Sequence, residues 1–322
     1  MRGLSLPMAF GLLLSLSSCF REDVPVVLPP PGGLQYLQVP QGPDYSRQYY
    51  VDLETADTLG MPVSVWDLCF EAQPDGWHVW INGANQARVA QTTATSLAAI
   101  TDTAGLVWKM DAPSWNPDST AIGAWPTHNF FYVLDRGPAF ADSIRFYKFQ
   151  LTGLSAMGYL LTLAALKDTL PINVVVQKLI DRQYMYFAFN KSAPFPFQEP
   201  PTDNWDLLFT RYRHIFTDQQ PPLPYVVTGV LISPQVAVAV DSTMDFDSIS
   251  YATVQQLEFT SRRNVIGYAW KYYDFSAQAF VVRPYINYII RDTKGIYWKL
   301  RFIDFYNSNG QKGYPTFAYQ QL

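Results

Sequence analysis

Short runs of Tyr, Phe, Val, Ile and Leu recur along most of the chain, separated by Gly, Pro, Asn and Asp. Runs of this length and composition are typical of β-strands. They predict strands over 49–53, 77–81, 129–134, 144–151, 184–189, 205–212, 225–232, 236–240, 281–290, 296–305 and 316–320. Helical periodicity is scarce: 87–100 fits a helix or a mobile loop, and 253–259 fits about two helical turns. We therefore predict an all-β fold with few helices.

The strand pattern occurs twice in the same order. Blocks at 49–53, 66–70, 131–135, 146–151 and 158–161 are matched by blocks at 186–189, 205–209, 287–291, 297–302 and 313–317. Repetition in one order indicates an internal duplication. We predict two related antiparallel β domains, residues 46–168 and 169–322, with the junction near 167–171.

One repeated block reads Trp-Asp-Leu-x-Phe, at 66–70 and at 205–209. Alternation along a strand places Trp, Leu and Phe on one face and Asp on the other. A short Asp side chain can accept hydrogen bonds from neighbouring backbone N–H groups and fix the entry to a strand. Asp67 and Asp206 are therefore interpreted as structural residues rather than catalytic ones.

The N-terminus has a different pattern. Arg2 precedes an apolar run over 4–16 that is too short to cross a bilayer comfortably, and small residues then lead to Cys19. This resembles a bacterial lipoprotein signal, which implies removal of residues 1–18 and acylation of Cys19, so that lipid alone anchors the protein. An ordinary secretory signal with an incidental cysteine is the alternative.

Residues 19–45 are rich in Pro and Gly and lack apolar periodicity, so we expect an extended tether there. The acidic pair Glu22-Asp23 resembles the surface-export signal of Bacteroidota lipoproteins. The expected location is the outer membrane, with the protein exposed at the cell surface; the periplasmic face is the alternative.

Composition limits the partners. Aromatic residues make up 16% of the chain, charged residues only 16%, and the formal net charge is −4. Such a chain has no basic field with which to bind nucleic acid. The chain has two cysteines, and if Cys19 is acylated then Cys69 has no intramolecular partner. Cys69 lies in an apolar run and is expected to be a small buried hydrophobic residue.

The second half resembles the HmuY family of Bacteroidota haem-binding lipoproteins, and the first half resembles it as a divergent copy. The resemblance lies in 186–189, 204–209 followed by Arg211-Tyr212, 288–292, 299–306 and 316–319. It implies a hand-shaped all-β fold that grips haem between two axial side chains and passes it to a TonB-dependent outer-membrane receptor. Haem, or another tetrapyrrole, is thus the expected ligand, and nutrient uptake, with iron acquisition, is the expected role.

Two residues are candidate axial ligands. His214 follows the strand at 205–212, and a neutral imidazole can bind haem iron, while Arg211 and Arg213 beside it could pair with the propionates. Met244 lies in a polar loop and offers a thioether. The stretch 271–276, where the resemblance implies a ligand, contains neither His nor Met.

The other titratable residues favour structural roles. His78 is interpreted as an exposed or stacking residue and His128 as a residue at a strand edge. Asp245 and Asp247 are too few for a calcium site, and no zinc spacing, phosphate loop or nucleophile elbow is visible. We expect a binding protein rather than an enzyme, without a protein-bound metal. The alternative to a haem carrier is a surface module that binds a glycan, or a protein partner of an outer-membrane uptake complex.

Overall fold

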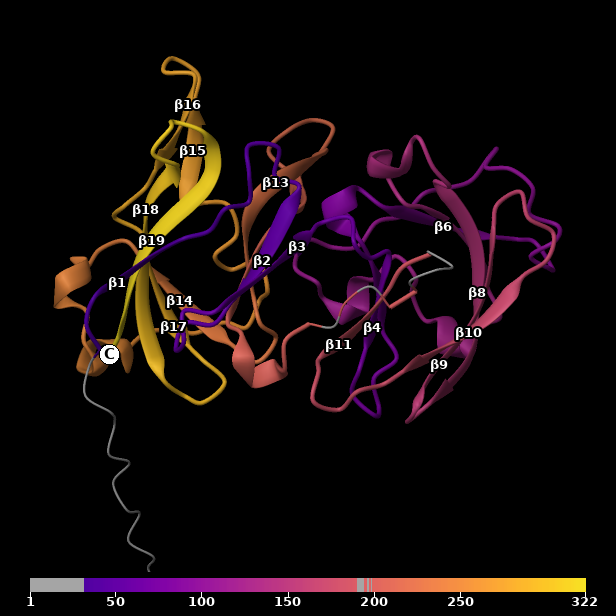
Figure 1. The fold of residues 1–322 in the computed structure, drawn as a ribbon, viewed down its shortest axis with the longest axis horizontal. Helices are drawn as coiled ribbons and strands as arrows, with labels where there is room; N and C mark the ends of the chain where they lie inside the picture. Colours follow the sequence, from indigo (N-terminus) through magenta and orange to yellow (C-terminus); the bar gives the residue numbers. More distant parts are fainter. Residues whose placement is uncertain (1–31, 190–193, 196, 198) are drawn as a thin grey trace, which may run out of the picture. The chain divides into compact units, whose positions relative to one another are not determined.

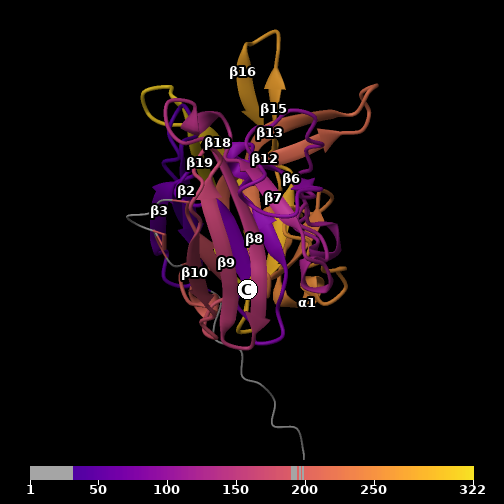
Figure 2. The ribbon, with the colours of Figure 1, turned by 90° about the vertical axis from the view of Figure 1, so that its right-hand side faces the viewer.

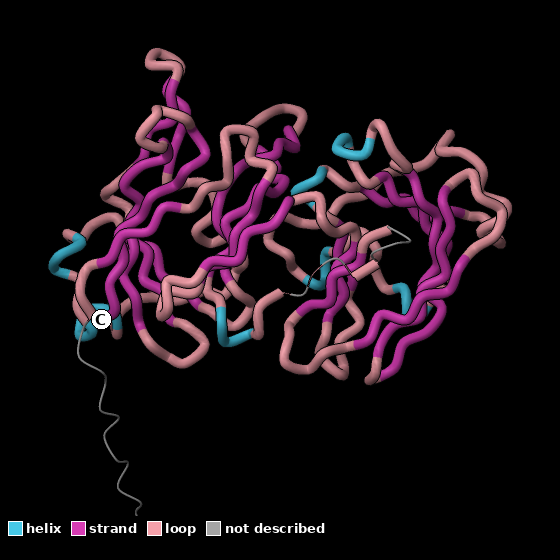
Figure 3. The backbone as a smooth tube through the Cα atoms, in the orientation of Figure 1, coloured by secondary structure: helices cyan, strands magenta, loops and turns pink. Residues whose placement is uncertain are grey.

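The protein is described by a computed structural model, which covers residues 32–189, 194–195, 197 and 199–322. Cys19 and the signal segment lie outside the described residues. Residues 31–322 form one compact unit. Within the described part, β-strands dominate, and the α-helical content is α1 (Tyr251–Val254) with several short 3-10 turns (Figure 3). The predicted all-β fold with few helices is confirmed.

The strands form two groups, here called lobe A and lobe B (Figure 1). In lobe A, one sheet has the order β10-β9-β8-β7-β6 and a smaller sheet has the order β11-β4-β5. Their bounds are β4 (Leu68–Glu71), β5 (Val79–Ile81), β6 (Arg88–Thr92), β7 (Phe131–Asp135), β8 (Phe146–Ser155), β9 (Gly158–Ala165), β10 (Ile172–Gln177) and β11 (Tyr184–Phe187).

Lobe B contains a sheet of order β1-β19-β18-β17-β14, a second of order β13-β12-β2-β3, and the hairpin β15-β16. Their bounds are β1 (Gln35–Gln38), β2 (Arg47–Val51), β3 (Thr58–Pro62), β12 (Leu207–Phe216), β13 (Leu223–Ile232), β14 (Ala237–Asp241), β15 (Lys271–Asp274), β16 (Ala279–Val282), β17 (Asn287–Arg291), β18 (Tyr297–Tyr306) and β19 (Lys312–Gln321). The named strand pairs are antiparallel in both lobes.

Each lobe has its own hydrophobic core, because alternate residues of its strands point inward. The core of lobe A includes Leu68, Phe149 and Leu161, all fully buried. The core of lobe B includes Phe209, Leu300 and Phe317, also fully buried. Burial of apolar area at about 25 cal/mol per Å² is the main source of stability for such sheets.

The repeat is visible in the topology. The meander β6-β7-β8-β9 of lobe A corresponds to β14-β17-β18-β19 of lobe B. However, β2 comes early in the chain and pairs with β12, with Val51 opposite Leu207, whereas β11 pairs with β4, with Phe187 opposite Leu68. Each copy of the repeat thus gives its first strands to the sheets of the other copy. The division into 46–168 and 169–322 stays a prediction, and the sheets are built across it.

Several local expectations were wrong. Residues 88–92 form strand β6, in a segment for which a helix or a mobile loop was expected, because they pair with β7. The run 281–290 is broken between β16 and β17 by a turn that contains Pro284, which cannot donate a ladder hydrogen bond. The expected helix at 253–259 is the shorter α1, and Thr253 closes its capping box with Ser250.

The repeated Trp does not share a face with Leu and Phe. Leu68 and Phe70 lie in the core of lobe A, but Trp66 packs with Cys69, Trp80, Tyr184 and Tyr186. The strand begins only at Leu68, so the alternation does not extend back to Trp66. This leaves the tryptophan in the contact between the lobes.

Candidate functional site

Aromatic side chains fill the contact between the two lobes. Strands β2 and β11 bring Tyr50 and Tyr186 together, and the Tyr50 hydroxyl donates to the Tyr186 hydroxyl at 3.3 Å. The Trp66 ring lies 5.1 Å from that of Tyr186, and the Trp205 ring lies 4.9 Å from that of Tyr50, both edge to face. Such geometry adds about 0.5–1.5 kcal/mol per pair beyond area burial.

A buried cation and a buried carboxyl group lie beside these rings. The Arg263 guanidinium lies 4.3 Å from the Trp115 ring centroid and 5.2 Å from that of Tyr184. Glu199 accepts the backbone N–H groups of Gln183 and Tyr184, both at 2.8 Å. Burial raises the pKa of Glu199 to about 7, against the opposing effect of these hydrogen bonds. The centre of the molecule therefore holds ionisable groups that are shielded from water.

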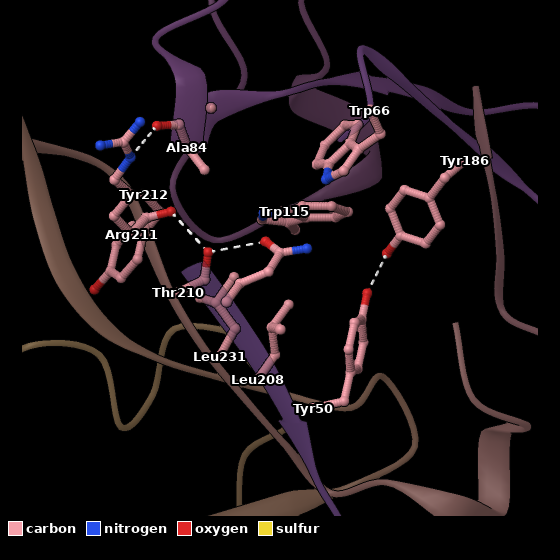
Figure 4. A pocket seen from close by; sticks show the side chains of 12 residues that line it. Tyr50, Trp66, Ala84, Trp115, Tyr186, Leu208, Thr210, Arg211, Tyr212 and Leu231 are labelled. Carbon is pink, nitrogen blue, oxygen red and sulfur yellow. Dashed lines mark hydrogen bonds between the residues drawn. The ribbon is translucent and has the colours of Figure 1, made fainter. Parts of the chain in front are cut away.

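A pocket opens beside this cluster, here called the interlobe pocket, and Figure 4 shows its labelled lining residues. Its cavity volume is small, about 30 Å³, which is room for about two water molecules. Trp66, Trp115 and Tyr186 lie on one side of the view, and Arg211 and Tyr212 lie on the other. The pocket is thus aromatic, with a few polar groups, which is the usual character of small-molecule sites.

His214 lies outside this pocket, near the end of β12. Its ring centroid is 4.8 Å from that of Tyr268 and 4.9 Å from that of Phe216, and Phe216 in turn contacts Tyr225. We call these four residues the His214 cluster. Burial lowers the pKa of His214 below 6.5, so the imidazole is neutral at pH 7, and its buried Nδ1 has no partner among the described residues.

Met244 is not in the His214 cluster. It packs against Ile249, Val254, Ile289 and Leu322, beside α1. Figure 2 draws α1 near the lower end of the molecule, whereas β12 and β13 are labelled near the upper end. The fold therefore does not bring the two predicted axial ligands together.

Arg211 and Arg213 alternate with His214 along β12, so they leave the strand on its other face. Arg211 Nε donates to the carbonyl oxygen of Ala84 at 2.7 Å. Arg213 lines a neighbouring pocket with Asp111. Neither arginine contacts the His214 ring.

The remaining predictions concern structural residues. Cys69 is fully buried, and burial raises the pKa of its thiol, which confirms that it is a core residue. His78 stacks on Trp77 at 3.9 Å and its Nδ1 lies 2.7 Å from Glu71 Oε2. His128 is exposed and stacks on Phe130 at 4.7 Å. His78 occupies the stacking position that was expected. The strand-edge position expected for His128 is wrong, because His128 ends the 3-10 turn Trp125–Thr127 and β7 begins only at Phe131.

The sequence did not reveal Trp115, Glu199 or Arg263. Each lies outside the named strands and helices, in a segment whose apolar pattern carries no period. A buried Glu and Arg on separate loops leave no local signal, because their environment is made by residues far away in the chain. The one local sign of this buried cluster in the sequence was an aromatic residue, Trp115, between polar Ser114 and Asn116.

A family comparison decides the relationship of this chain. The model of the HmuY protein family matches residues 44–319, which include both lobes. The chain belongs to the HmuY family. The resemblance first noted in the second half therefore extends over both copies of the repeat.

Solved structures give weaker likenesses, each with a TM-score below 0.5. Apo PinO from Porphyromonas gingivitis is 9% identical, covers 90% of this chain and 97% of its own, and has a TM-score of 0.36. The Apo HmuY analog TFO from Tannerella forsythia is 11% identical, covers 90% and 95%, and has a TM-score of 0.27. A putative HmuY-like haem-binding protein from Bacteroides vulgatus is 11% identical, covers 89% and 90%, and has a TM-score of 0.24.

No curated protein sequence matches the chain significantly. Within the described segments, no group of three or more His, Cys, Asp or Glu side chains is arranged to hold a metal ion. No helix of the described part is long and apolar enough to span a bilayer.

Proposed function

We propose that this member of the HmuY family binds haem, or another tetrapyrrole, at the His214 cluster and serves nutrient uptake from a lipid anchor at Cys19. Family membership supports haem as the ligand class. The observation that carries the site is the packing of the His214 ring against the rings of Phe216 and Tyr268, and burial there lowers the pKa of the imidazole. A neutral imidazole nitrogen is the form that ligates haem iron.

The surroundings of His214 suit a flat apolar ligand. Tyr225 is 60% exposed, and Phe216 and Tyr268 are half-buried, so aromatic faces reach the surface beside the imidazole. Haem stacked there would bury apolar area on its macrocycle and on these rings. Met244 packs elsewhere, so His214 is the axial ligand that this proposal retains, and the propionate role of Arg211 and Arg213 requires their side chains to turn.

The cellular part of the proposal rests on the N-terminal sequence. The tether expected over 19–45 is shorter, because Gln35–Gln38 form β1 beside β19 and Val39 is fully buried. Acylated Cys19 and the Pro-rich residues before β1 would hold the protein at the outer membrane, exposed at the cell surface. Haem would then pass to an outer-membrane receptor of the TonB-dependent class. Labelling with a radioactive fatty acid tests the anchor: the wild type is expected to carry the label and Cys19→Ala is not.

Haem binding is tested by titrating segment 31–322 with oxidised haem and recording the Soret band. This segment contains both hydrophobic cores, and leaving out the lipid avoids detergent micelles that take up haem. A shifted band that saturates near one equivalent is expected. A spectrum identical to that of free haem, under oxidising and reducing conditions, would overturn the proposal.

Single variants locate the site. His214→Ala should abolish the shifted band, because the axial nitrogen is lost. His128→Ala is the matched control, since His128 also stacks on a phenylalanine but is exposed and lies outside the His214 cluster. Met244→Ala is expected to bind as the wild type does. Loss of binding in the Met244 variant alone would transfer the site to the other end of lobe B.

A further inference from the structure

Strand β10 forms an uncovered edge of the large sheet in lobe A. The sheet order β10-β9-β8-β7-β6 places β10 at one end, and Figure 2 shows it beside β9. Edge strands present backbone N–H and C=O groups that can pair with another chain. Three other edges are covered, because Val89 of β6, Val230 of β13 and Val238 of β14 each exchange two backbone hydrogen bonds with a loop residue. Strand β10 has no such cover among the described residues.

The ladder between β10 and β9 determines which backbone groups of β10 remain free. Just after the paired residues, the Lys178 N–H donates to the Met157 carbonyl oxygen at 3.0 Å. Hydrogen-bonded positions alternate along an antiparallel ladder, so every second residue counted back from Lys178 bonds to β9. The N–H and C=O groups of Asn173, Val175 and Gln177 therefore point away from the sheet. Within the described part of the chain they have no hydrogen-bond partner.

This free edge is symmetric about Val175. Asn173 and Gln177 lie two positions to either side of it. Antiparallel pairing with an identical strand therefore places Val175 opposite Val175 of the second copy, and Asn173 opposite Gln177. Each of these pairs can exchange two backbone hydrogen bonds. The Cβ atoms of directly opposite residues are about 5 Å apart, so the Asn173 and Gln177 side-chain amides can bond as well. The strand thus complements itself.

The side chains that would flank this pairing are apolar and exposed. Val175 is 56% exposed, and Leu160, which lies opposite it on β9, is 38% exposed. Both lie on the outer face of the sheet, since the next residue, Val176, is fully buried in the core of lobe A. In a symmetric pair, two valines and two leucines would form one apolar strip across the joined sheets. Covering this strip would bury apolar area that a single chain leaves in water.

The charge of the edge also favours a second copy as the occupant. No charged residue occurs between Asp168 and Lys178, whereas the whole chain has a formal net charge of −4. Copies of equal net charge repel one another, and a neutral edge lets their strands pair without like charges opposite each other. A strongly charged peptide would find no opposite charge here. The partner that matches this edge is therefore the same chain.

We propose that β10 pairs with β10 of a second copy, antiparallel and about a two-fold axis at Val175, so that two lobe A sheets join into one continuous sheet. The contact is a short strand edge, so it belongs to the small and transient class of interfaces. We expect a dissociation constant of roughly 1–100 µM. The His214 cluster belongs to lobe B, so this dimer requires no haem.

Sedimentation velocity of segment 31–322 over a concentration range of roughly 5–500 µM tests the dimer. This segment contains both hydrophobic cores, and leaving out the lipid avoids association through acyl chains. The sedimentation coefficient should increase from that of a monomer to that of a dimer across the range. The coefficient of a monomer at every concentration would overturn the proposal.

Variants at Val175 locate the interface. Val175→Lys and Val175→Glu should each raise the dissociation constant at least ~10-fold, because like charges then face each other across the axis. An equimolar mixture of the two variants should form the dimer again, because opposite charges meet. Val175→Pro should also prevent dimer formation while leaving lobe A folded, since it removes an N–H that β9 does not use.

Tyr36→Lys is the matched control. Tyr36 is 63% exposed and lies on β1, which is the edge strand of a sheet in lobe B. This variant should form dimers as the wild type does, and thermal unfolding checks that all variants are folded. A dimer that persists in the single Val175 variants, or a mixture no tighter than either variant alone, would exclude β10 as the interface. Loss of the dimer in the Tyr36 variant alone would also refute the proposal and would assign the contact to β1.

Discussion

The Tyr50 hydroxyl donates to the Tyr186 hydroxyl at 3.3 Å, so two residues 136 positions apart meet in the contact between the lobes. They occupy equivalent positions of the repeat: Tyr50 precedes Val51, which pairs with Leu207, and Tyr186 precedes Phe187, which pairs with Leu68. The contact is therefore built by the exchange of first strands between the two copies. The interlobe pocket and the neighbouring pocket that contains Asp111 both adjoin the contact between the lobes. The position of both pockets therefore depends on the exchange of first strands.

The two repeated aspartates should differ in their contribution to stability. Asp206 Oδ2 accepts the Leu53 N–H at 2.8 Å, and Asp67 Oδ2 accepts the Phe189 N–H at 2.7 Å. Asp67 also pairs with buried Arg136 through two contacts of 2.8 Å. Asp206→Ala is expected to lower the free energy of unfolding by about 1–3 kcal/mol. Asp67→Ala is expected to lower it by about 3–5 kcal/mol, because this change leaves the buried Arg136 without its carboxylate partner.

Urea unfolding at pH 7 measures both values, with Asp102→Ala as the exposed control, expected to change stability by less than about 0.5 kcal/mol. Equal losses for the Asp67 and Asp206 variants would contradict the role given to Arg136.

Glu199 should make the protein lose stability as pH rises from about 4.5 to 7. Burial raises the pKa of its carboxyl from 4.5 to about 7, so the folded state binds more protons than the unfolded state in that interval. The free energy of unfolding then falls with increasing pH, by at most about 1.4 kcal/mol per pH unit for one group.

Glu199→Gln removes this titration while keeping an acceptor for the Gln183 and Tyr184 N–H groups. Burial also raises the pKa of Asp206 to about 7. Asp206 therefore contributes the same decrease in stability with rising pH to the wild type and to the variant. Chemical denaturation at a series of pH values measures the difference in slope. Parallel curves for the wild type and the variant would show that Glu199 is not protonated in the folded state.

Lys271 should have the opposite effect and should make the protein gain stability as pH rises above 7. Its ammonium lies 4.1 Å from the Trp270 ring centroid and 2.6 Å from the Thr228 carbonyl oxygen. Burial lowers its pKa from 10.5 to about 7, so the unfolded state binds more protons between these values. The titration of Lys271 therefore makes the free energy of unfolding increase with pH between pH 7 and about 10.5.

Lys271→Met replaces the lysine with an apolar side chain of similar length. It should be more stable than the wild type at pH 6, and the advantage should shrink as pH approaches 10. Thermal unfolding at pH 6, 8 and 10 measures this difference, and an advantage that does not change with pH would refute the buried titration.

Gly137 should tolerate no side chain. Its φ is +95°, and a Cβ there would lie within 2 Å of the Asn85 carbonyl oxygen. Gly105 also has a positive φ, +70°, but no atom within 4 Å of such a Cβ. Gly105→Ala should lower the free energy of unfolding by about 1 kcal/mol, because alanine is strained at a positive φ. Gly137→Ala should lower it by about 3 kcal/mol or more, because its Cβ would also clash with the Asn85 carbonyl oxygen. The same unfolding assay compares them, and similar losses would mean that the 83–85 turn moves freely.

Much of the fold could be predicted because its signals are local. Runs such as 297–302 carry both strand composition and alternation, and they form β18. Asp67 and Asp206 act on backbone N–H groups as predicted, but those groups belong to Phe189 and Leu53, far away in the chain. The residue type indicated the kind of contact, and the partner depended on the topology.

The site was less predictable for the same reason. His214 could be singled out by its position after a strand, but its neighbour Tyr268 arrives from a loop before β15. Arg211 was expected near His214, yet its position on β12 turns it toward Ala84. Arg263 and Glu199 gave no pattern at all, because burial of a charge is created entirely by long-range packing.

The sequence by itself determined the all-β class, the duplication, the family and the burial of Cys69, since these follow from composition, alternation and ordered motifs. The tertiary structure alone decided which strands are exchanged, that Met244 lies away from His214, and that Gln48 and Arg211 face an aromatic pocket. Those features depend on contacts between residues more than a hundred positions apart, such as Tyr50 with Tyr186 and Arg211 with Ala84. Local pattern cannot encode such pairings, because their free energy arises only when both lobes are packed together.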